Sequence, residues 1–308
     1  MRRELRRVTG TDGIGPYTLL RVARGRLDAG APGQFFMLEA RGRVLPRPMS
    51  LCLASRRELA FLIDPVGPGT RALCSLEPGN ELHILGPLGN GFDLDVRRPL
   101  LVGGGIGVAP LPLLSQVLGA PPAVLGFRSD WHAEAAVLVP NAEICIEPIL
   151  VTDLLHNDRH DILACGPEPM LEAVRAIAPG AQLAWEAPMA CGYGACHGCA
   201  VEIAGELRRL CVEGPVLRAP RGESMLPSQT PSSPTPAPRR DERATAAQRL
   251  RLPRRARGSR RPAWGNPWFP HRPLLRRDGI TIRIAAPAGQ SPAPPDDVSA
   301  SIVVKPQE

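Results

Sequence analysis

Four cysteines within 21 residues restrict the fold of this chain more than any other feature. They lie in residues 185–219, a Gly-rich stretch too small to build a hydrophobic core of its own. Such a segment needs a staple, and in a chain without an export signal grouped cysteines bind metal more often than they form disulfides. The sequence therefore predicts a metal-stapled segment near residue 200.

The spacing of these cysteines indicates which metal centre they hold. The ligands would be Cys191, Cys196, Cys199 and Cys211. Their C-x4-C-x2-C…C pattern is that of a plant-type [2Fe–2S] cluster, and the intervening glycines let the backbone wrap closely and aim N–H groups at the sulfurs. A structural zinc site is the alternative, but zinc knuckles prefer paired C-x2-C units and only one is present. His197, between two of the cysteines, is expected to face solvent.

Composition divides the chain in two. Residues 1–219 hold 21 Arg, no Lys and 23 acidic residues, whereas residues 220–308 hold 16 basic residues, 7 acidic residues and 16 Pro. The basic balance therefore belongs to the second part, and we expect neither a nucleic-acid nor a membrane partner. Residues 220–308 are predicted to be a disordered Pro/Arg-rich tail. Their Arg, Pro and Ala usage also suits a GC-rich gene read out of frame, a hypothesis that sequencing the locus would test.

Hydropathy gives the expected location. No run of about 18 apolar residues occurs, and the Arg-rich N-terminus has no apolar signal segment. We expect a soluble cytoplasmic protein.

The pattern of apolar runs predicts a multi-domain α+β chain. Up to about residue 96, short runs at 17–22, 34–38, 59–63 and 81–85 are separated by Gly/Pro turns, which is typical of a small antiparallel β-barrel. From residue 97 to 182, strands at 99–102, 123–127, 143–146 and 161–164 alternate with helices at 109–118 and 169–177, which predicts a doubly wound parallel sheet. Residues 183–219 form the third domain, with a hairpin over 200–210.

Two groups of residues could hold nucleotide cofactors. In the first part, Arg47-Pro48-Met49-Ser50 closes one β segment and the turn of Gly69 and Thr70 follows another, so they could hold a flavin pyrophosphate and ring edge. In the second, the turn containing Gly103, Gly104, Gly105 and Gly107 joins a strand to a helix, where a dinucleotide phosphate binds. Cys165 and Gly166 end a later buried strand at the ligand-binding edge of the sheet. Ordinary turns, and a small core residue at Cys165, are the alternatives.

The order of these motifs along residues 8–219 resembles the ferredoxin-reductase-like iron–sulfur flavoproteins. Met189 to Cys199 and Cys211 to Val216 resemble in particular the electron transfer subunits of NAD-dependent dihydroorotate dehydrogenase B. The resemblance implies an FAD-binding barrel, an NAD-binding domain and a [2Fe–2S] domain. It adds Ile63, Asp64 and Pro65 to the FAD contacts, although Asp64 and Pro65 depart from the aromatic and basic residues usual there.

The resemblance also implies a function. Electrons would pass from the FMN of a catalytic partner, through the [2Fe–2S] cluster and FAD, to NAD⁺ in pyrimidine biosynthesis. The assembly would be a heterotetramer with two copies of each subunit, and no residue of this chain would act as a catalytic acid or base on dihydroorotate. Alternatives are a ferredoxin–NAD(P) reductase, an oxygenase reductase component, or a non-enzymatic redox regulator that carries the cluster.

Overall fold

The structure, a computed structural model, describes residues 2–40, 42, 45–155, 160–203 and 206–218. The predicted tail, residues 220–308, lies outside the described residues. Within the described ranges, none of the helices is long and apolar enough to cross a membrane.

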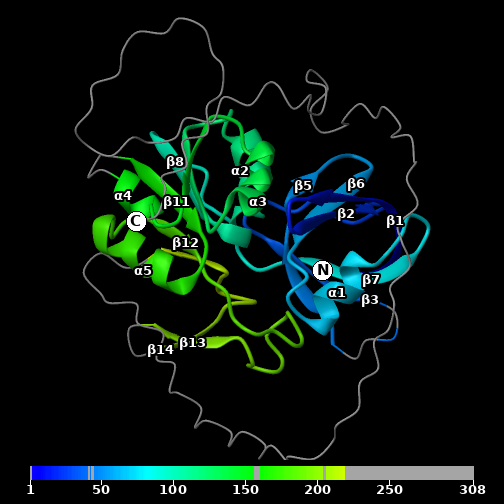
Figure 1. The fold of residues 1–308 in the computed structure, drawn as a ribbon. Helices are drawn as coiled ribbons and strands as arrows, with labels where there is room; N and C mark the ends of the chain where they lie inside the picture. The colour runs from blue at the N-terminus through cyan, green and yellow to red at the C-terminus, as the bar shows by residue number, and fades with distance from the viewer. Residues whose placement is uncertain (1, 41, 43–44, 156–159, 204–205, 219–308) are drawn as a thin grey trace, which may run out of the picture. The chain divides into compact units, whose positions relative to one another are not determined.

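The N-terminal part forms a curled antiparallel sheet of seven strands, in the order β4-β3-β7-β1-β2-β6-β5 (Figure 1). Its elements are β1 (Arg2–Ile14), β2 (Tyr17–Ala23), β3 (Phe35–Ala40), β4 (Arg47–Ser50), β5 (Leu53–Ala54), β6 (Glu58–Ile63), α1 (Pro68–Cys74) and β7 (Glu81–Leu88). Strand β1 belongs to both halves of the curl, because its first half pairs with β7 and its second half with β2. Since β4 and β5 are edge strands, the predicted barrel is confirmed as an open half-barrel.

The four predicted strands of this part are confirmed as β2, β3, β6 and β7, but β1 was not predicted. Its residues alternate between exposed and partly covered positions, as a strand requires, yet the covered positions near its start are charged. Glu4 and Arg6 occupy two of them and form an ion pair with each other. Burial along β1 therefore alternates with the period of two expected of a strand. Hydrophobic and polar residue types do not alternate in the same way.

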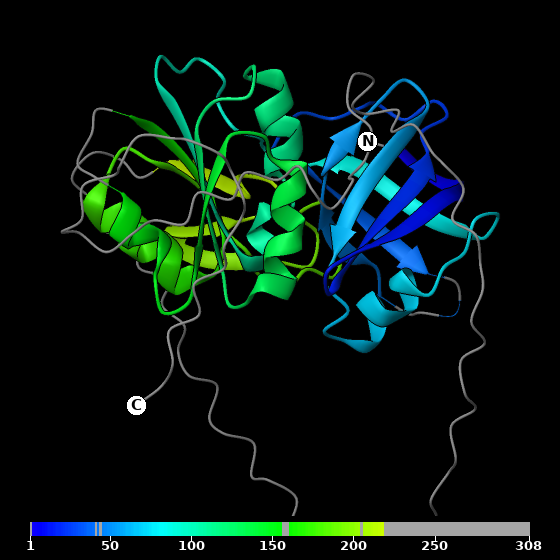
Figure 2. The same cartoon turned by 45° about the horizontal axis from the view of Figure 1, so that its top comes forward.

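The middle of the chain forms a six-stranded sheet in the order β10-β9-β8-β11-β12-β15. The first five strands in this order run parallel to one another. The strands are β8 (Pro99–Gly104), β9 (Ala123–Phe127), β10 (Ala142–Ile146), β11 (Asp161–Cys165) and β12 (Gln182–Ala184). The helices are η1 (Gly105–Val108), α2 (Leu111–Val117), α3 (Asp130–Ala133), η2 (Glu134–Leu138), α4 (Val151–Leu154) and α5 (Glu168–Ile177). Helices α2 and α5 cover opposite faces (Figure 2), which confirms the doubly wound fold. The strand order reverses between β8 and β11, and ligands bind at such a point.

The cysteine-rich segment is tied to both sheets. Its predicted hairpin is confirmed as β13 (Ala200–Ile203) and β14 (Glu206–Arg209), and β15 (Val216–Arg218) then pairs with β12. On the other side, the Asn90 amide beyond β7 donates to the Glu213 carbonyl over 3.0 Å. The division at residues 96, 182 and 219 stays a prediction.

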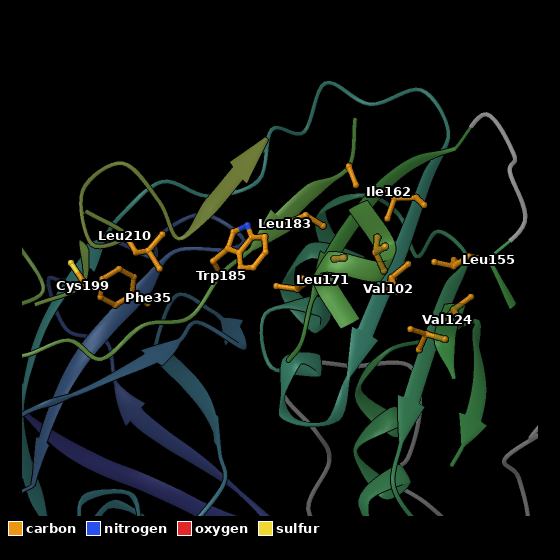
Figure 3. Packing of buried hydrophobic residues seen from close by; sticks show 14 of the residues in the cluster. Phe35, Val102, Val124, Leu155, Ile162, Leu171, Leu183, Trp185, Cys199 and Leu210 are labelled. Carbon is orange, nitrogen blue, oxygen red and sulfur yellow. The ribbon is translucent and has the colours of Figure 1, made fainter. Parts of the chain in front are cut away.

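Strand β3 separates two hydrophobic cores. Phe36 and Leu38 point into the half-barrel core, where the rings of Phe36 and Phe61 meet edge to face at 5.6 Å. Phe35 and Met37, on the opposite face of β3, belong to a central core shared with the parallel sheet and the cysteine-rich segment. Figure 3 shows Trp185 in that core, between Leu183 on one side and the group of Phe35, Cys199 and Leu210 on the other.

Candidate functional site

The four predicted metal ligands lie in one loop and the turn after the hairpin. Cys199 precedes β13 and Cys211 follows β14, so the hairpin returns the chain to its starting point and sets their Sγ atoms 3.1 Å apart. Both are buried. Cys191 is half-buried and Cys196 is exposed, and the backbone N–H of Cys196 points at the Cys191 sulfur over 3.5 Å. The Cys196 side chain also hydrogen-bonds to Cys191, so the thiols form two pairs, Cys191 with Cys196 and Cys199 with Cys211.

This paired arrangement fits a two-iron cluster. Each iron of a [2Fe–2S] centre takes two protein ligands, whereas a structural zinc ion takes all four around one point. Among the residues that the structure describes, no three Cys, His, Asp or Glu side chains meet closely enough to hold a single ion. His197 is exposed, as predicted, and its φ of 59° lies in the left-handed region.

Backbone N–H groups of the loop surround the sulfurs. Gly194 donates to the Cys211 sulfur over 3.1 Å. Burial raises the pKa of the Cys191 thiol, but hydrogen bonds from loop N–H groups, that of Tyr193 first, outweigh this and lower its pKa to about 6. Burial, followed by the neighbouring Cys199, raises the pKa of Cys211 to about 12. A bound metal would deprotonate both, and the N–H groups would then stabilise the thiolates.

An arginine on the hairpin holds the loop in place. The guanidinium of Arg209 donates to the Gly194 carbonyl over 3.2 Å and lies 3.3 Å from a carboxylate oxygen of Glu213. That carboxylate also accepts the Arg209 backbone N–H at 2.7 Å. No local pattern in the sequence indicates this pair, because its two members contact the loop only once the hairpin has formed.

The predicted flavin residues converge from two elements. Arg47 begins β4, and its guanidinium lies over Gly69 at the start of α1: a Cβ added to Gly69 would sit 2.3 Å from the Arg47 Nε. Thr70 uses its hydroxyl to cap α1, accepting the Gly67 N–H over 3.0 Å. Arg47 and Gly69 are thus neighbours, while Thr70 is engaged in local structure.

Residues 63–65, which flank this site, lie near Tyr17, a residue that the sequence does not mark as part of a site. Ile63 is buried at the end of β6, and Asp64 and Pro65 are partly covered. Burial, and then the nearby Asp64 carboxylate, raises the pKa of Tyr17 to about 12, while the charge of Arg128 opposes the rise. Tyr17 also meets the His132 ring edge to face at 5.9 Å. Residues of the half-barrel, of the turn after β9 and of α3 therefore meet beside the predicted flavin segment.

The predicted dinucleotide residues also come together. A Cβ on Gly107 would lie 2.3 Å from the Cys165 carbonyl oxygen and 2.5 Å from the Gly166 Cα, so the turns after β8 and β11 touch through their backbones. Only glycine permits that approach. The contact lies where the strand order reverses. Cys165 is buried, and burial raises the pKa of its thiol, as for a small core residue.

Comparisons with known proteins agree with this arrangement. Residues 186–221 match the family model described as the iron–sulfur cluster binding domain of dihydroorotate dehydrogenase B. The dihydroorotate dehydrogenase B (NAD⁺) electron transfer subunit of Geobacillus sp. (strain WCH70) is 36% identical over 226 residues, which cover 64% of this chain and 87% of the relative. The chain belongs to this family of electron transfer subunits. The subunit of Clostridium perfringens (strain 13 / Type A) is 34% identical, over 66% of this chain and 89% of its own length.

A solved structure supports the fold of the chain. The structure of an NADH-dependent reduced ferredoxin–NADP oxidoreductase superposes with a TM-score of 0.62 at 22% identity, over 70% of this chain and 88% of that chain. This likeness confirms the ferredoxin-reductase-like architecture and speaks of fold alone. That each predicted residue contacts its cofactor stays a prediction.

Proposed function

We propose that this chain is the subunit of dihydroorotate dehydrogenase B that carries electrons from the catalytic subunit to NAD⁺, through a [2Fe–2S] cluster and FAD, in pyrimidine biosynthesis. The observation that carries the proposal is the pairing of four thiols within the segment that matches the family model. When bound, the cluster supplies one-electron steps and FAD converts them into hydride transfer.

The chain's own residues would bind and position these groups. The thiols of Cys191, Cys196, Cys199 and Cys211 would hold the iron atoms. Arg47 and Gly69 would hold the FAD pyrophosphate, with Pro48, Met49, Ser50, Ile63, Asp64, Pro65 and Thr70 lining the rest of its site. Gly103, Gly104, Gly105, Gly107, Cys165 and Gly166 would receive NAD⁺ at the carboxyl ends of β8 and β11. None of these groups needs to exchange a proton with dihydroorotate.

The partner would dock over the exposed side of the cysteine loop. Cys196 is exposed, and Tyr193 in the same loop and Val212, which lies against Gly194 of that loop, leave 52% and 39% of their surfaces open. Exposed apolar side chains around a redox centre suit a protein partner, since docking there would shorten the path to its own cofactor. We propose that this partner contains FMN, that the assembly holds two of each subunit, and that it works in the cytoplasm.

The test is anaerobic reduction of NAD⁺ by dihydroorotate, using the full chain purified together with the catalytic subunit from the same genome. We expect NADH to form, and we expect Cys196→Ser to abolish its formation and the EPR signal of the cluster. His197→Asn is the matched control, because it changes the next residue and keeps one that tolerates the left-handed backbone. If the wild-type complex carries FAD and iron but forms no NADH from dihydroorotate, a general ferredoxin or oxygenase reductase role would replace the proposal.

A further inference from the structure

The cysteine loop rests directly on the half-barrel at one residue. Gly192 is buried, and a Cβ added there would lie 2.5 Å from Cγ and 2.9 Å from Sδ of Met37, with Leu88 Cδ1 at 3.2 Å. Its φ of 80° is left-handed. The backbone beside the first ligand, Cys191, is therefore in van der Waals contact with a β3 side chain, and only glycine allows so close an approach.

Met37 is also the neighbour of the predicted flavin strand. Strand β3 pairs antiparallel with β4, with Met37 opposite Pro48 and Phe35 opposite Ser50. Residues that face one another across a pair point to the same side of the sheet, so Met37 shares its face with two of the predicted FAD residues. The ligand loop therefore contacts a side chain of β3, the strand that lies next to the one assigned to the flavin.

The contact is dry and firmly packed. Met37 is 1% exposed and shares the central core with Phe35, Leu210, Cys199 and Cys211. Side chains in such a core keep fixed positions because the packing is close to crystalline density. The loop therefore cannot approach β3 further without a clash. It cannot move away from β3 without leaving a cavity.

We propose that Met37 is a positioning residue that sets the distance between the cluster and the flavin, and thereby the rate of electron transfer between them. The inference rests on the proposed function, because it takes the four thiols as cluster ligands and β4 as the flavin strand. Electron tunnelling falls steeply with distance, so a small displacement of the loop lowers the rate. The side chain acts through its volume and is not itself oxidised or reduced.

The test separates flavin reduction from cluster reduction in the full chain, in complex with its partner. NADH is mixed anaerobically with the protein, and the flavin and cluster absorbances are followed in a stopped-flow instrument. In Gly192→Ala we expect unchanged flavin bleaching and several-fold slower cluster bleaching, because the new methyl group has to push the loop away from Met37. The EPR g-values and the reduction potential of the cluster should stay at the wild-type values, which a general loss of structure would not allow.

The double variant Gly192→Ala/Met37→Ala controls for backbone strain. It keeps the strained left-handed alanine but removes the Cγ and Sδ atoms that the new methyl meets, so we expect cluster bleaching faster than in Gly192→Ala and close to the rate of Met37→Ala alone. Gly180→Ala adds a methyl group that meets open space, away from the loop and from Met37, and should behave as wild type. A double variant as slow as the single one would overturn the proposal.

Variants of Met37 cover the case in which Gly192→Ala loses its iron. Met37→Leu nearly conserves the volume and should keep the rate, whereas Met37→Ala should slow cluster bleaching with iron and FAD contents intact. A wild-type rate in Met37→Ala would sink the inference while leaving the proposed function standing. The proposed function fails separately if the wild-type chain lacks FAD or the cluster signal, or if NADH does not bleach the flavin.

Discussion

At the flavin strand, a single guanidinium joins two motifs that are far apart in the sequence. Arg47 lies on Gly69 and, among the residues that the structure describes, otherwise donates only to the nearby carbonyls of Leu45 and Pro46, over 3.2 Å each. Among the described residues no carboxylate forms an ion pair with it. Its charge is therefore available to a phosphate group.

We expect Arg47→Ala to weaken FAD binding by about 10- to 100-fold, since hydrogen bonds to charged groups contribute roughly 1.5–3 kcal/mol each. The measurement is the FAD dissociation constant of the reconstituted protein, from flavin fluorescence. Arg56→Ala, at an exposed turn position before β6, is the matched control. Equal affinities in the two variants would remove Arg47 from the flavin site.

Asp161 offers a test of pH dependence. Its carboxylate accepts the backbone N–H groups of Arg97 at 2.8 Å and Arg98 at 3.1 Å, and these bonds, that from Arg98 first, lower its pKa. A carboxyl with a depressed folded pKa adds stability above its unfolded pKa of about 3.9, and this stability disappears as the pH falls through the folded pKa. Because the group is exposed, we expect Asp161→Asn to lower the free energy of unfolding by about 1 kcal/mol or less at pH 7. Urea titrations at pH 7 and pH 3 should show the difference shrinking; a difference that grows in acid would contradict this account.

At the scale of elements, the sequence predicts what depends on local pattern. Buried parallel strands such as β9 and β11 read as apolar runs, and the Gly-rich turn after β8 has its own signature. Strand β1 was missed because Glu4 and Arg6 pair with each other at covered positions, and β15 because Val216–Arg218 is too short to carry a pattern. The contact of Gly107 with Cys165 depends on two strands meeting, which no local signal contains.

That contact gives a prediction for the dinucleotide site. In Gly107→Ala the new methyl would meet the Cys165 carbonyl, so the turns after β8 and β11 must separate. Overpacking of this kind costs about 1–3 kcal/mol. We expect a lower free energy of unfolding and a weaker affinity for NADH, with FAD content unchanged. Gly180→Ala, where a methyl meets open space, should change neither quantity. Unaltered NADH affinity in Gly107→Ala would place the dinucleotide elsewhere.

At the scale of the whole described molecule, one core joins the three cofactor regions. It takes residues from β3 of the half-barrel, from the parallel sheet and from the ligand loop, Cys199 and Cys211 included. Composition and periodicity predicted each region separately. They could not predict that the regions share a core, because its members come from one face of each of two sheets whose packing forms only in the folded chain.

Trp185 tests how much this shared core contributes. It follows β12, is 7% exposed, and its Nε1 has no hydrogen-bond partner among the described residues. Trp185→Ala should lower the free energy of unfolding by about 3–5 kcal/mol, the cost of deleting a large aromatic side chain from a core. Trp185→Phe removes the unpaired N–H while keeping most of the packing, so its cost should be far smaller. Denaturant unfolding, with far-UV circular dichroism and cluster absorbance as separate probes, measures both effects. Trp131→Phe is the control, because that indole is 58% exposed.

In Trp185→Ala the two probes should still change together, since Cys199 and Cys211 lie in the same core as the sheet. Loss of the cluster absorbance well before the circular dichroism change would mean that the ligand loop unfolds on its own, and that the core does not couple the three regions.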